Sequence, residues 1–358
     1  MNAYGVIMAG GGGTRFWPLS RQKTPKQLLN LTGNELMINE AIDRLSYIVA
    51  KKDIFIVTNE VQVTSMLKAT EGRIQPGHIL SEPSARNTAA CVGYAALEII
   101  KKYGDGVMVI TPSDHYIKDN ASFIRILHTA VKTAERDDKL ITIGITPTFP
   151  STGFGYIKFD KNAVGDVKPV TEIKEKPDKE SAEEYAASGE YVWNSGVFVW
   201  KASVILEKIR GLASDIYNDL VKIGHAMGTA EEKDTIRTVY PGIRKISIDY
   251  AIMEPSAVSG DVLVIPGEFG WNDVGSWEMM DALQEIDADG NVRIGDTLAV
   301  NTTNSVLYSS GKMIAVVGVD DLVVVEVPDA IMVCRKDKAQ DVKLIVDALQ
   351  AAERKELL

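Results

Sequence analysis

The sequence of 358 residues contains little of what several common functional sites require. Its two cysteines, Cys91 and Cys334, lie far apart and make neither a disulfide framework nor a zinc site. The four histidines are scattered and suggest no metal-binding or catalytic set. No apolar run approaches the ~20 residues that cross a bilayer, and the N-terminus lacks the features of a signal peptide. We therefore expect a cytoplasmic protein.

Basic residues are also fewer than acidic ones over the whole chain, but one segment reverses this balance. Acidic residues outnumber basic ones by 49 to 39, which gives a net charge of −10 and argues against general binding to nucleic acids or membranes. Residues 9–27 nevertheless contain four cations, Arg15, Arg21, Lys23 and Lys26, and no acid. This local concentration of positive charge indicates an anionic ligand.

The same segment contains four consecutive glycines, Gly10 to Gly13, after a strand-like apolar run, Tyr4–Met8. Backbone N–H groups without side chains can approach phosphate oxygens closely, and cations then neutralise the phosphate. The loop matches neither the Walker A nor the dinucleotide-binding pattern, because Arg15 stands where both require a glycine counted from Gly10. The glycines alone fit a structural turn equally well, but Arg15 and Lys26 favour polyphosphate binding.

Short apolar runs alternate with amphipathic helical patterns over the first 145 residues, which predicts an α/β fold with helices on both faces of a parallel sheet. The middle third mixes strands and helices, and the chain after residue 285 is rich in Val, Ile and Thr. We expect a catalytic domain over residues 1–285 and a small β-rich domain with a terminal helix over residues 286–358. Helices are predicted at residues 35–49 (with Asn34 as N-cap), 87–102, 122–135, 179–188, 202–223, 231–239, 276–283 and 338–355.

Two aspartates are candidates for a metal site. Asp114 follows the predicted strand at residues 107–110, and ligands of such sheets bind at the carboxyl ends of strands. Asp273 lies in a corner, Phe269–Trp277, that contains two tryptophans and two glycines. Mg²⁺ prefers one or two carboxylates together with phosphates and water, so this pair is sufficient. Each aspartate alone could equally cap a turn or a helix.

Other segments carry groups that suit a sugar phosphate or a base. Glu175 and Lys176 could bind a sugar hydroxyl and a phosphate, although taken alone they fit an ordinary exposed ion pair better. Glu82 favours guanine, because a carboxylate can accept from the adjacent N1–H and N2–H donors of that base. Asn87 is most simply the N-cap of the helix that follows.

Together and in this order, the segments resemble the sugar-nucleotide pyrophosphorylase family, and within it the mannose-1-phosphate guanylyltransferases. The matching pieces are Gly10–Ser20, Pro25–Gln27, Glu82–Thr88, Pro112–His115, Gly153–Tyr156, Glu175–Pro177, Trp193–Gly196 and Trp271–Trp277. The resemblance implies a Rossmann-like nucleotidyltransferase domain with a mixed, mostly parallel sheet. It also implies that the tail is a small module similar to a left-handed β-helix, followed by a terminal helix.

The resemblance implies transfer of GMP from GTP to mannose 1-phosphate, with GDP-mannose and pyrophosphate as products and Mg²⁺ as cofactor. The implied Mg²⁺ ligands are Asp114 and Asp273. The implied catalytic residues are Arg15, Lys26 and Lys176. Nucleotide contacts are implied for Gly10, Gly11, Gly12, Gly13, Thr14, Glu82, Asn87 and Thr88, and sugar-phosphate contacts for Gly155, Glu175, Lys176 and Asn194.

Some alternatives remain open. The base or the sugar could differ, or the chain could be a nucleotide-sensing homologue without activity, although both metal carboxylates are present. A nicotinamide oxidoreductase is disfavoured because Arg15 replaces the third glycine. Longer relatives carry an additional phosphomannose isomerase domain. A chain of 358 residues has no room for it, so isomerase activity is not expected here. We expect a homodimer without nucleic-acid or membrane partners.

Overall fold

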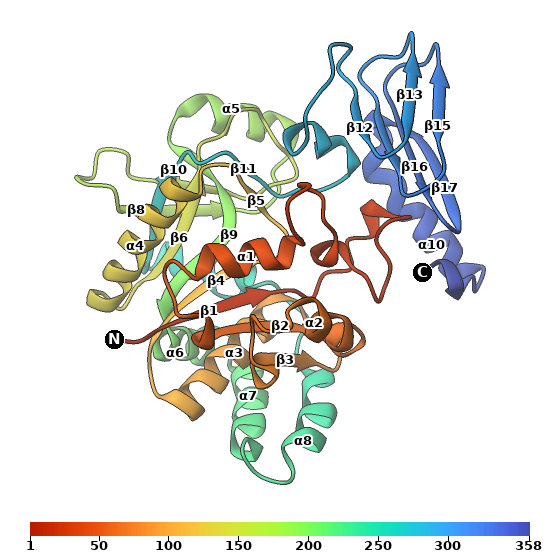
Figure 1. Cartoon of the computed structure of the whole chain (residues 1–358). Coiled ribbons are helices and arrows are strands. Elements are labelled where there is room, and N and C mark those ends of the chain that lie inside the picture. Colours follow the sequence, from red (N-terminus) through yellow and green to blue (C-terminus); the bar gives the residue numbers. More distant parts are fainter.

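The structure is a computed structural model that describes residues 1–358, with a large α/β part and a smaller C-terminal β part (Figure 1). The α/β part is built on a nine-stranded sheet in the order β3-β2-β1-β4-β9-β6-β10-β8-β7. Its strands are β1 (Ala3–Met8), β2 (Ile54–Asn59), β3 (Ile79–Glu82), β4 (Val107–Pro112), β6 (Leu140–Ile145), β7 (Tyr156–Phe159), β8 (Lys168–Lys174), β9 (Tyr191–Lys201) and β10 (Val262–Gly267). The strands β8 and β9 run opposite to the others, so the sheet is mixed and mostly parallel, as predicted.

The central strands are nearly continuous apolar runs. Because successive side chains point to opposite sides of a sheet, such runs make both faces apolar. In β1, Val6 packs into one buried cluster and Ile7 into another, and in β4 Met108 and Val109 divide in the same way. The sheet therefore needs helices on both sides to keep these side chains from water.

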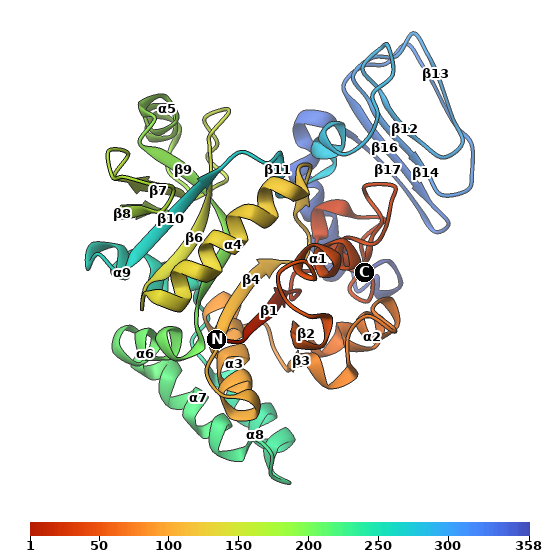
Figure 2. The same ribbon diagram turned by 60° about the vertical axis from the view of Figure 1, so that its left-hand side comes forward.

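Helices cover both faces of the sheet (Figure 2). One buried cluster joins the sheet to α1 (Met37–Leu45), α2 (Val63–Ala69), α4 (Asn120–Arg136) and α5 (Lys179–Ser188). The other joins it to α3 (Asn87–Tyr103), α6 (Ala202–Leu212), α7 (Ser214–Ala226), α8 (Glu232–Val239) and α9 (Glu254–Val258). This layered arrangement confirms the predicted α/β class.

The parallel strands β1, β3 and β4 end at one edge of the sheet. A separate two-stranded sheet is formed by β5 (Tyr116–Ile117), which follows β4 in the chain, and β11 (Trp271–Asn272), which follows β10. These two strands are antiparallel. The pairing of Tyr116 with Asn272 brings the segment after β4 next to a segment more than 150 residues later. It therefore fixes the distance between Asp114 and Asp273, which neighbour these two strands.

The C-terminal part consists of short, mostly parallel strands and ends in a helix. Its strands are β12 (Val292–Ile294), β13 (Thr297–Val300), β14 (Val306–Ser309), β15 (Ile314–Val317), β16 (Leu322–Val327) and β17 (Ala330–Arg335). The pairs β12–β14, β14–β16 and β13–β15 are parallel, and β17 closes the edge of β16 in the antiparallel direction. A 3₁₀ segment, η9 (Lys336–Val342), then leads into α10 (Lys343–Ala351).

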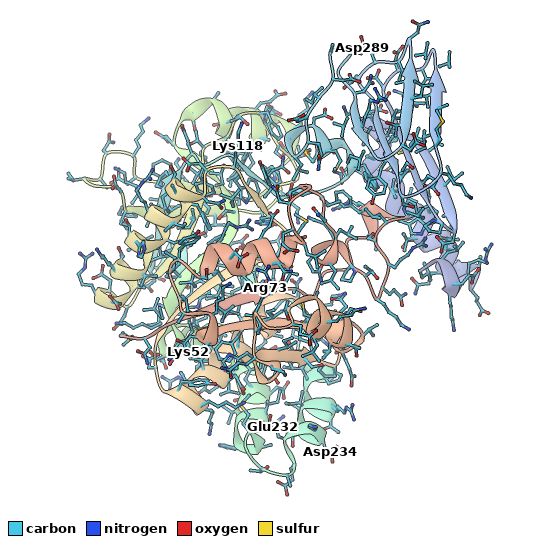
Figure 3. All side chains as sticks on the ribbon, in the orientation of Figure 1. Lys52, Arg73, Lys118, Glu232, Asp234 and Asp289 are labelled. Carbon is cyan, nitrogen blue, oxygen red and sulfur yellow. The ribbon has the colours of Figure 1, made fainter.

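A third buried cluster joins the two parts of the chain. It contains Phe16 and Trp17 near the N-terminus, Trp277 before the β module, and Ala339 and Val342 in η9. Figure 3 shows the elongated result, with Asp289 on the β module at one end of the molecule and Glu232 and Asp234, in the first turn of α8, at the other. The boundary at residues 285 and 286 stays a prediction, because this core belongs to both sides of it.

Several predicted helix boundaries are wrong. The helix expected at residues 35–49 is α1, which begins at Met37 with Leu36 as its N-cap. Asn34 does not cap it, because the chain at residues 30–34 forms turns in which Asn30 Oδ1 accepts from Gly33 N and Thr32 Oγ1 accepts from Asn34 N. The pattern at residues 202–223 spans two helices separated at Ala213. The predicted helices at residues 276–283 and 338–355 contain 3₁₀ segments, Trp277–Ala282 and η9.

Candidate functional site

In the glycine loop after β1, carbonyl oxygens accept hydrogen bonds from the protein but the glycine N–H groups donate none. Buried Gln27 donates through Nε2 to Ala9 O at 2.7 Å and to Gly11 O at 3.2 Å, and Gln62 donates to Gly11 O at 3.3 Å. None of the N–H groups of Gly10 to Gly13 donates a hydrogen bond within the chain. The carbonyls are therefore held against the protein while the N–H groups stay available to an anion.

Gly13 allows the glycine loop to approach the buried residue Lys26 closely. Its φ is +60°, and a Cβ at this position would lie 2.3 Å from Lys26 Cβ. No other residue fits there without displacing Lys26, which is 5% exposed. Lys26 Nζ in turn lies 2.8 Å from Asp114 Oδ2 and donates to the backbone oxygen of Asp273 at 2.7 Å.

The two predicted metal ligands lie on either side of this lysine. Burial raises the pKa of Asp114, but the charge of Lys26 and its hydrogen bond outweigh this effect, so the pKa of Asp114 lies below its usual value. The pKa of Asp273 is raised by burial, which the Lys26 charge only partly offsets. The site thus contains one compensated carboxylate and one that lacks a cationic side-chain partner.

These groups face a polar cavity of about 340 Å³. It is lined by glycine and by polar side chains only: Gly13, Thr14, Arg15, Lys26, Asp114, His115, Asp273, Gly275 and Lys343. Arg15 is exposed and forms no ion pair, so its charge is free to meet a ligand. Residues from the glycine loop, the end of β4 and the corner after β11 therefore meet at one place.

A second cavity of about 240 Å³ adjoins the first and shares His115 and Asp273 with it. All the predicted sugar-phosphate residues line it: Gly155, Glu175, Lys176 and Asn194. A Cβ on Gly155 would lie 2.4 Å from Glu175 Oε2, so a larger residue at this position would displace the Glu175 carboxylate. Lys176 is 62% exposed and pairs with Glu175 at 3.2 Å.

Asp249 also lines the second cavity, and sequence reasoning missed it. Its Oδ1 accepts from Asn194 Nδ2 at 2.7 Å, so it orients this amide. Burial and the nearby Glu175 charge raise the pKa of Asp249 to about 6. The only sequence signal was an acid in the otherwise apolar stretch that forms the π-helical turn Asp249–Met253.

His115 is a second residue that the sequence did not single out. It lines both cavities, and Trp271 Nε1 donates to its Nδ1 at 3.1 Å. Burial lowers the pKa of His115 to about 4, so the ring is neutral at ordinary pH and accepts this hydrogen bond.

The predicted nucleotide contacts divide into two groups. Gly13 and Thr14 line the first cavity and Thr88 the second, whereas Gly10, Gly11, Gly12, Glu82 and Asn87 line neither. Glu82 is 5% exposed, accepts a hydrogen bond from Tyr240, and lies beside the loop, since a Cβ on Gly10 would be 3.1 Å from its Oε2. Burial raises the pKa of Glu82.

Asn87 is not the N-cap of α3. The N-cap is Arg86, and Asn87 has a φ of 66° with its Oδ1 accepting from the next N–H, that of Thr88. Thr88 ties the start of α3 to a distant segment, because its hydroxyl oxygen accepts from Ile248 N at 2.8 Å.

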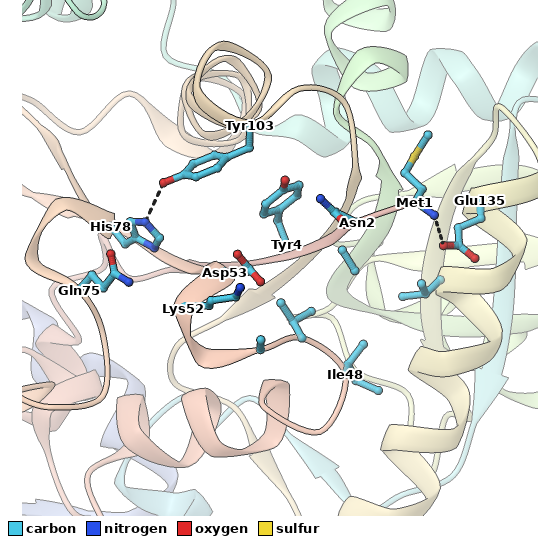
Figure 4. A pocket seen from close by; sticks show the side chains of 14 residues that line it. Met1, Asn2, Tyr4, Ile48, Lys52, Asp53, Gln75, His78, Tyr103 and Glu135 are labelled. Carbon is cyan, nitrogen blue, oxygen red and sulfur yellow. Dashed lines mark hydrogen bonds and ion pairs between the residues drawn. The ribbon is translucent and has the colours of Figure 1, made fainter.

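A larger cavity, of about 720 Å³, lies away from these residues (Figure 4). Its lining includes Tyr4, Lys52, His78 and Tyr103, and the His78 ring is hydrogen-bonded to the Tyr103 hydroxyl at 2.9 Å. It contains none of the predicted site residues. The two smaller cavities are therefore the better candidate site.

Comparison with known proteins agrees with this geometry. Residues 4–289 match a family model described as nucleotidyl transferase. This chain belongs to the nucleotidyl transferase family. Residues 295–349 of this nucleotidyl transferase match a second model, described as a MannoseP isomerase/GMP-like beta-helix domain, which confirms the β-helix character of the tail.

The nucleotidyl transferase is 38% identical over 361 residues to a Salmonella montevideo protein named mannose-1-phosphate guanylyltransferase, covering 98% of this chain and 74% of that protein. It is 39% identical over 354 residues to the xanthan biosynthesis protein XanB of Xanthomonas campestris, covering 98% and 74%. A solved structure from Thermus thermophilus, described as "mannose-1-phosphate geranyltransferase", superposes with a TM-score of 0.87 at 31% identity, covering 98% of this chain and all of the other. The resemblance noted in the sequence is thus confirmed. None of the helices of this chain has the length and apolar character needed to span a bilayer.

Proposed function

We propose that this chain transfers GMP from GTP to mannose 1-phosphate and releases GDP-mannose and pyrophosphate. One observation carries the proposal: Gly13 of a glycine loop with free N–H groups, three cations and two carboxylates border a polar cavity, which adjoins a second cavity lined by the predicted sugar-phosphate residues. The name of the relative from Salmonella montevideo, mannose-1-phosphate guanylyltransferase, supports the same reaction.

The phosphates of GTP bind along the glycine loop in this proposal. The free N–H groups of Gly10 to Gly13 donate to phosphate oxygens, and Arg15 and Lys26 neutralise the charge of the departing pyrophosphate. Lys26 is held in place by Asp114 and the backbone of Asp273, so it needs little reorganisation to act.

Mannose 1-phosphate binds in the second cavity. Glu175 and Asn194 bind hydroxyl groups of the hexose, and Lys176 binds its phosphate. Lys176 is free to make this contact, because its exposed ion pair with Glu175 is weakly held.

The carboxylates Asp114 and Asp273 are the residues that would hold Mg²⁺. Their chemistry fits this ion, which needs few protein ligands when phosphates and water complete its shell. Asp273 is a half-buried carboxylate without a cationic side-chain partner. Bound there, Mg²⁺ supplies positive charge to the phosphate oxygens near the reacting phosphorus.

The reaction needs no catalytic base. A phosphate oxygen of mannose 1-phosphate is already ionised, and it forms the new bond to the α-phosphorus of GTP. The bond from that phosphorus to the α,β-bridging oxygen breaks, and its electron pair leaves with pyrophosphate. Because two anions must approach one another, the residues of the site act mainly by neutralising charge and by holding the reactants in line.

Glu82 selects the base in this proposal. One of its oxygens already accepts from Tyr240, and the other faces the glycine loop. A base with two adjacent N–H donors, such as guanine, suits a carboxylate better than a base with one donor between two carbonyls.

The test is an assay of pyrophosphate release that combines GTP, UTP, dTTP or ATP with mannose 1-phosphate or glucose 1-phosphate, in the presence of Mg²⁺. We expect the highest kcat/KM for GTP with mannose 1-phosphate. A higher value for another pair would replace the proposed substrates, and binding of GDP-mannose without any turnover would indicate a sensing protein.

Asp114→Ala tests the site itself. We expect a loss of kcat of at least about 100-fold, because the variant removes a metal ligand and the anchor of Lys26. Asp138→Ala is the matched control, since it removes an exposed aspartate paired with Lys201 away from the cavity. Near-normal turnover of Asp114→Ala would remove this residue from the mechanism.

The predicted homodimer remains a prediction. Light scattering during size-exclusion chromatography would give the mass in solution, to be compared with the chain mass of 39.1 kDa.

A further inference from the structure

One cation in the phosphate cavity comes from the C-terminal part of the chain. Lys343 lines it together with Arg15, Lys26, Asp114 and Asp273, and every other residue of the lining lies before position 276. Lys343 is the first residue of α10, more than 300 residues after the glycine loop. Neither the sequence pattern nor the resemblance pointed to it.

The position of Lys343 is fixed by the packing on its N-terminal side. The preceding residue, Val342, is 2% exposed, and Ala339 one turn earlier is fully buried. Both belong to the cluster that contains Phe16 and Trp17, which directly follow Arg15. The start of α10 is therefore packed on the same core as the phosphate loop.

Polar contacts fasten the rest of the C-terminal segment to the same region. Trp17 Nε1 donates to Leu357 O at 2.8 Å, and Arg21 pairs with Asp329 at 2.7 Å. Gln340 donates to Ser276 Oγ at 3.1 Å, three residues after Asp273. Figures 1 and 2 both place α10 and the C-terminus beside the N-terminal loop segment. The C-terminal part is thus held against the cavity, to which it contributes Lys343.

The charge of Lys343 has no partner within the chain. Neighbouring lysines are paired, Lys336 with Asp281 at 2.7 Å and Lys338 with Asp341 at 3.9 Å, but Lys343 forms no ion pair or side-chain hydrogen bond. Lys26 is neutralised by Asp114. Arg15 and Lys343 are therefore the two cavity cations that form no ion pair within the chain.

We propose that Lys343 binds the β- and γ-phosphates of the nucleotide and the pyrophosphate formed from them. This inference rests on the proposed function, and it makes the C-terminal domain part of the active site rather than a separate module. An ammonium on a flexible stem suits a phosphate group whose position changes as it departs. Because the cavity already contains Arg15 and Lys26, Lys343 completes a ring of three cations around the leaving group.

The test compares Lys343→Ala with Lys343→Arg and with Lys338→Ala, an exposed lysine of the same segment that does not line the cavity. Calorimetry measures the binding of GTP and of inorganic pyrophosphate, and the reverse reaction gives the KM for pyrophosphate. We expect Lys343→Ala to weaken both ligands about 10-fold or more, since a charge-assisted contact is lost. Lys343→Arg should retain most of the affinity, and Lys338→Ala should match the wild type.

The binding of mannose 1-phosphate and of GMP, which lack the β- and γ-phosphates, should not change in Lys343→Ala. Unfolding midpoints should agree for all variants, because the side chain of Lys343 is exposed. Wild-type affinity of Lys343→Ala for pyrophosphate and GTP would overturn this inference, as would equal weakening of all four ligands. A wild type that binds GTP but does not react it with mannose 1-phosphate would refute the proposed function while leaving the Lys343 comparison decisive.

Discussion

Gly13→Ala is the sharpest test of how the phosphate loop is built. Its Cβ would lie 2.3 Å from Lys26 Cβ and 2.9 Å from Lys26 N, in a backbone conformation with φ of +60°. A non-glycine residue in this left-handed conformation costs ~1–2 kcal/mol, and an added carbon in a packed site costs ~1–3 kcal/mol more. We therefore expect a loss of about 2–5 kcal/mol in the free energy of unfolding.

The measurement is urea denaturation of the ligand-free protein, with Gly11→Ala as the matched control. A Cβ on Gly11 meets nothing within 4 Å and its φ is not positive, so this variant should unfold within ~0.5 kcal/mol of the wild type. Gly13→Ala should also lower kcat, because the clash displaces Lys26 from Asp114. If Gly13→Ala is as stable as Gly11→Ala, the close approach of the loop to Lys26 is not what requires glycine, and this reasoning is refuted.

Three further variants test other parts of the structure. Hydrogen bonds from Lys139 and Lys208 hold the pKa of Asp261 below its usual range, so the stability advantage of the wild type over Asp261→Asn should be full above pH ~4 and shrink in denaturation curves at lower pH. The pKa of Asp249 is raised to about 6, so the contribution of this residue to the stability of the wild type should be lost as pH rises from ~4 to ~7. Over this range Asp249→Asn should gain stability relative to the wild type by up to about 3 kcal/mol, and an unchanged difference would contradict the raised pKa. Trp277 is fully buried in the cluster shared by both parts, so Trp277→Ala should lower the free energy of unfolding by ~3–5 kcal/mol. The wild type should unfold in one transition by fluorescence and by circular dichroism. Two separate transitions would argue against a shared core.

Local pattern predicted most of the regular elements. The helix at residues 179–188 was placed at its observed limits, because its apolar spacing and its flanking residues agree. Where a boundary depends on backbone geometry, pattern failed. The apolar spacing of residues 202–223 continues through Ala213, whose φ of −143° breaks the helix.

The chemistry of the site was predicted where it follows sheet topology. Asp114 and Asp273 were expected to meet, and the structure brings them to the same cavity through the pairing of β5 with β11. Residues whose roles depend on the folded arrangement carried no such signal. Gln27 holds the loop carbonyls, Asp249 orients Asn194, and Lys343 enters from a different domain, and each depends on contacts between distant segments that spacing along the chain does not encode.

The most direct test of the central claim follows the label of radioactive GTP in the presence of mannose 1-phosphate and Mg²⁺. With phosphorus-32 in the α position, the account predicts label in GDP-mannose, and with the label in the γ position it predicts label in pyrophosphate only. Label from the γ position on the sugar, or α label that ends as free GMP whether or not the sugar phosphate is present, would contradict attack of mannose 1-phosphate on the α-phosphorus.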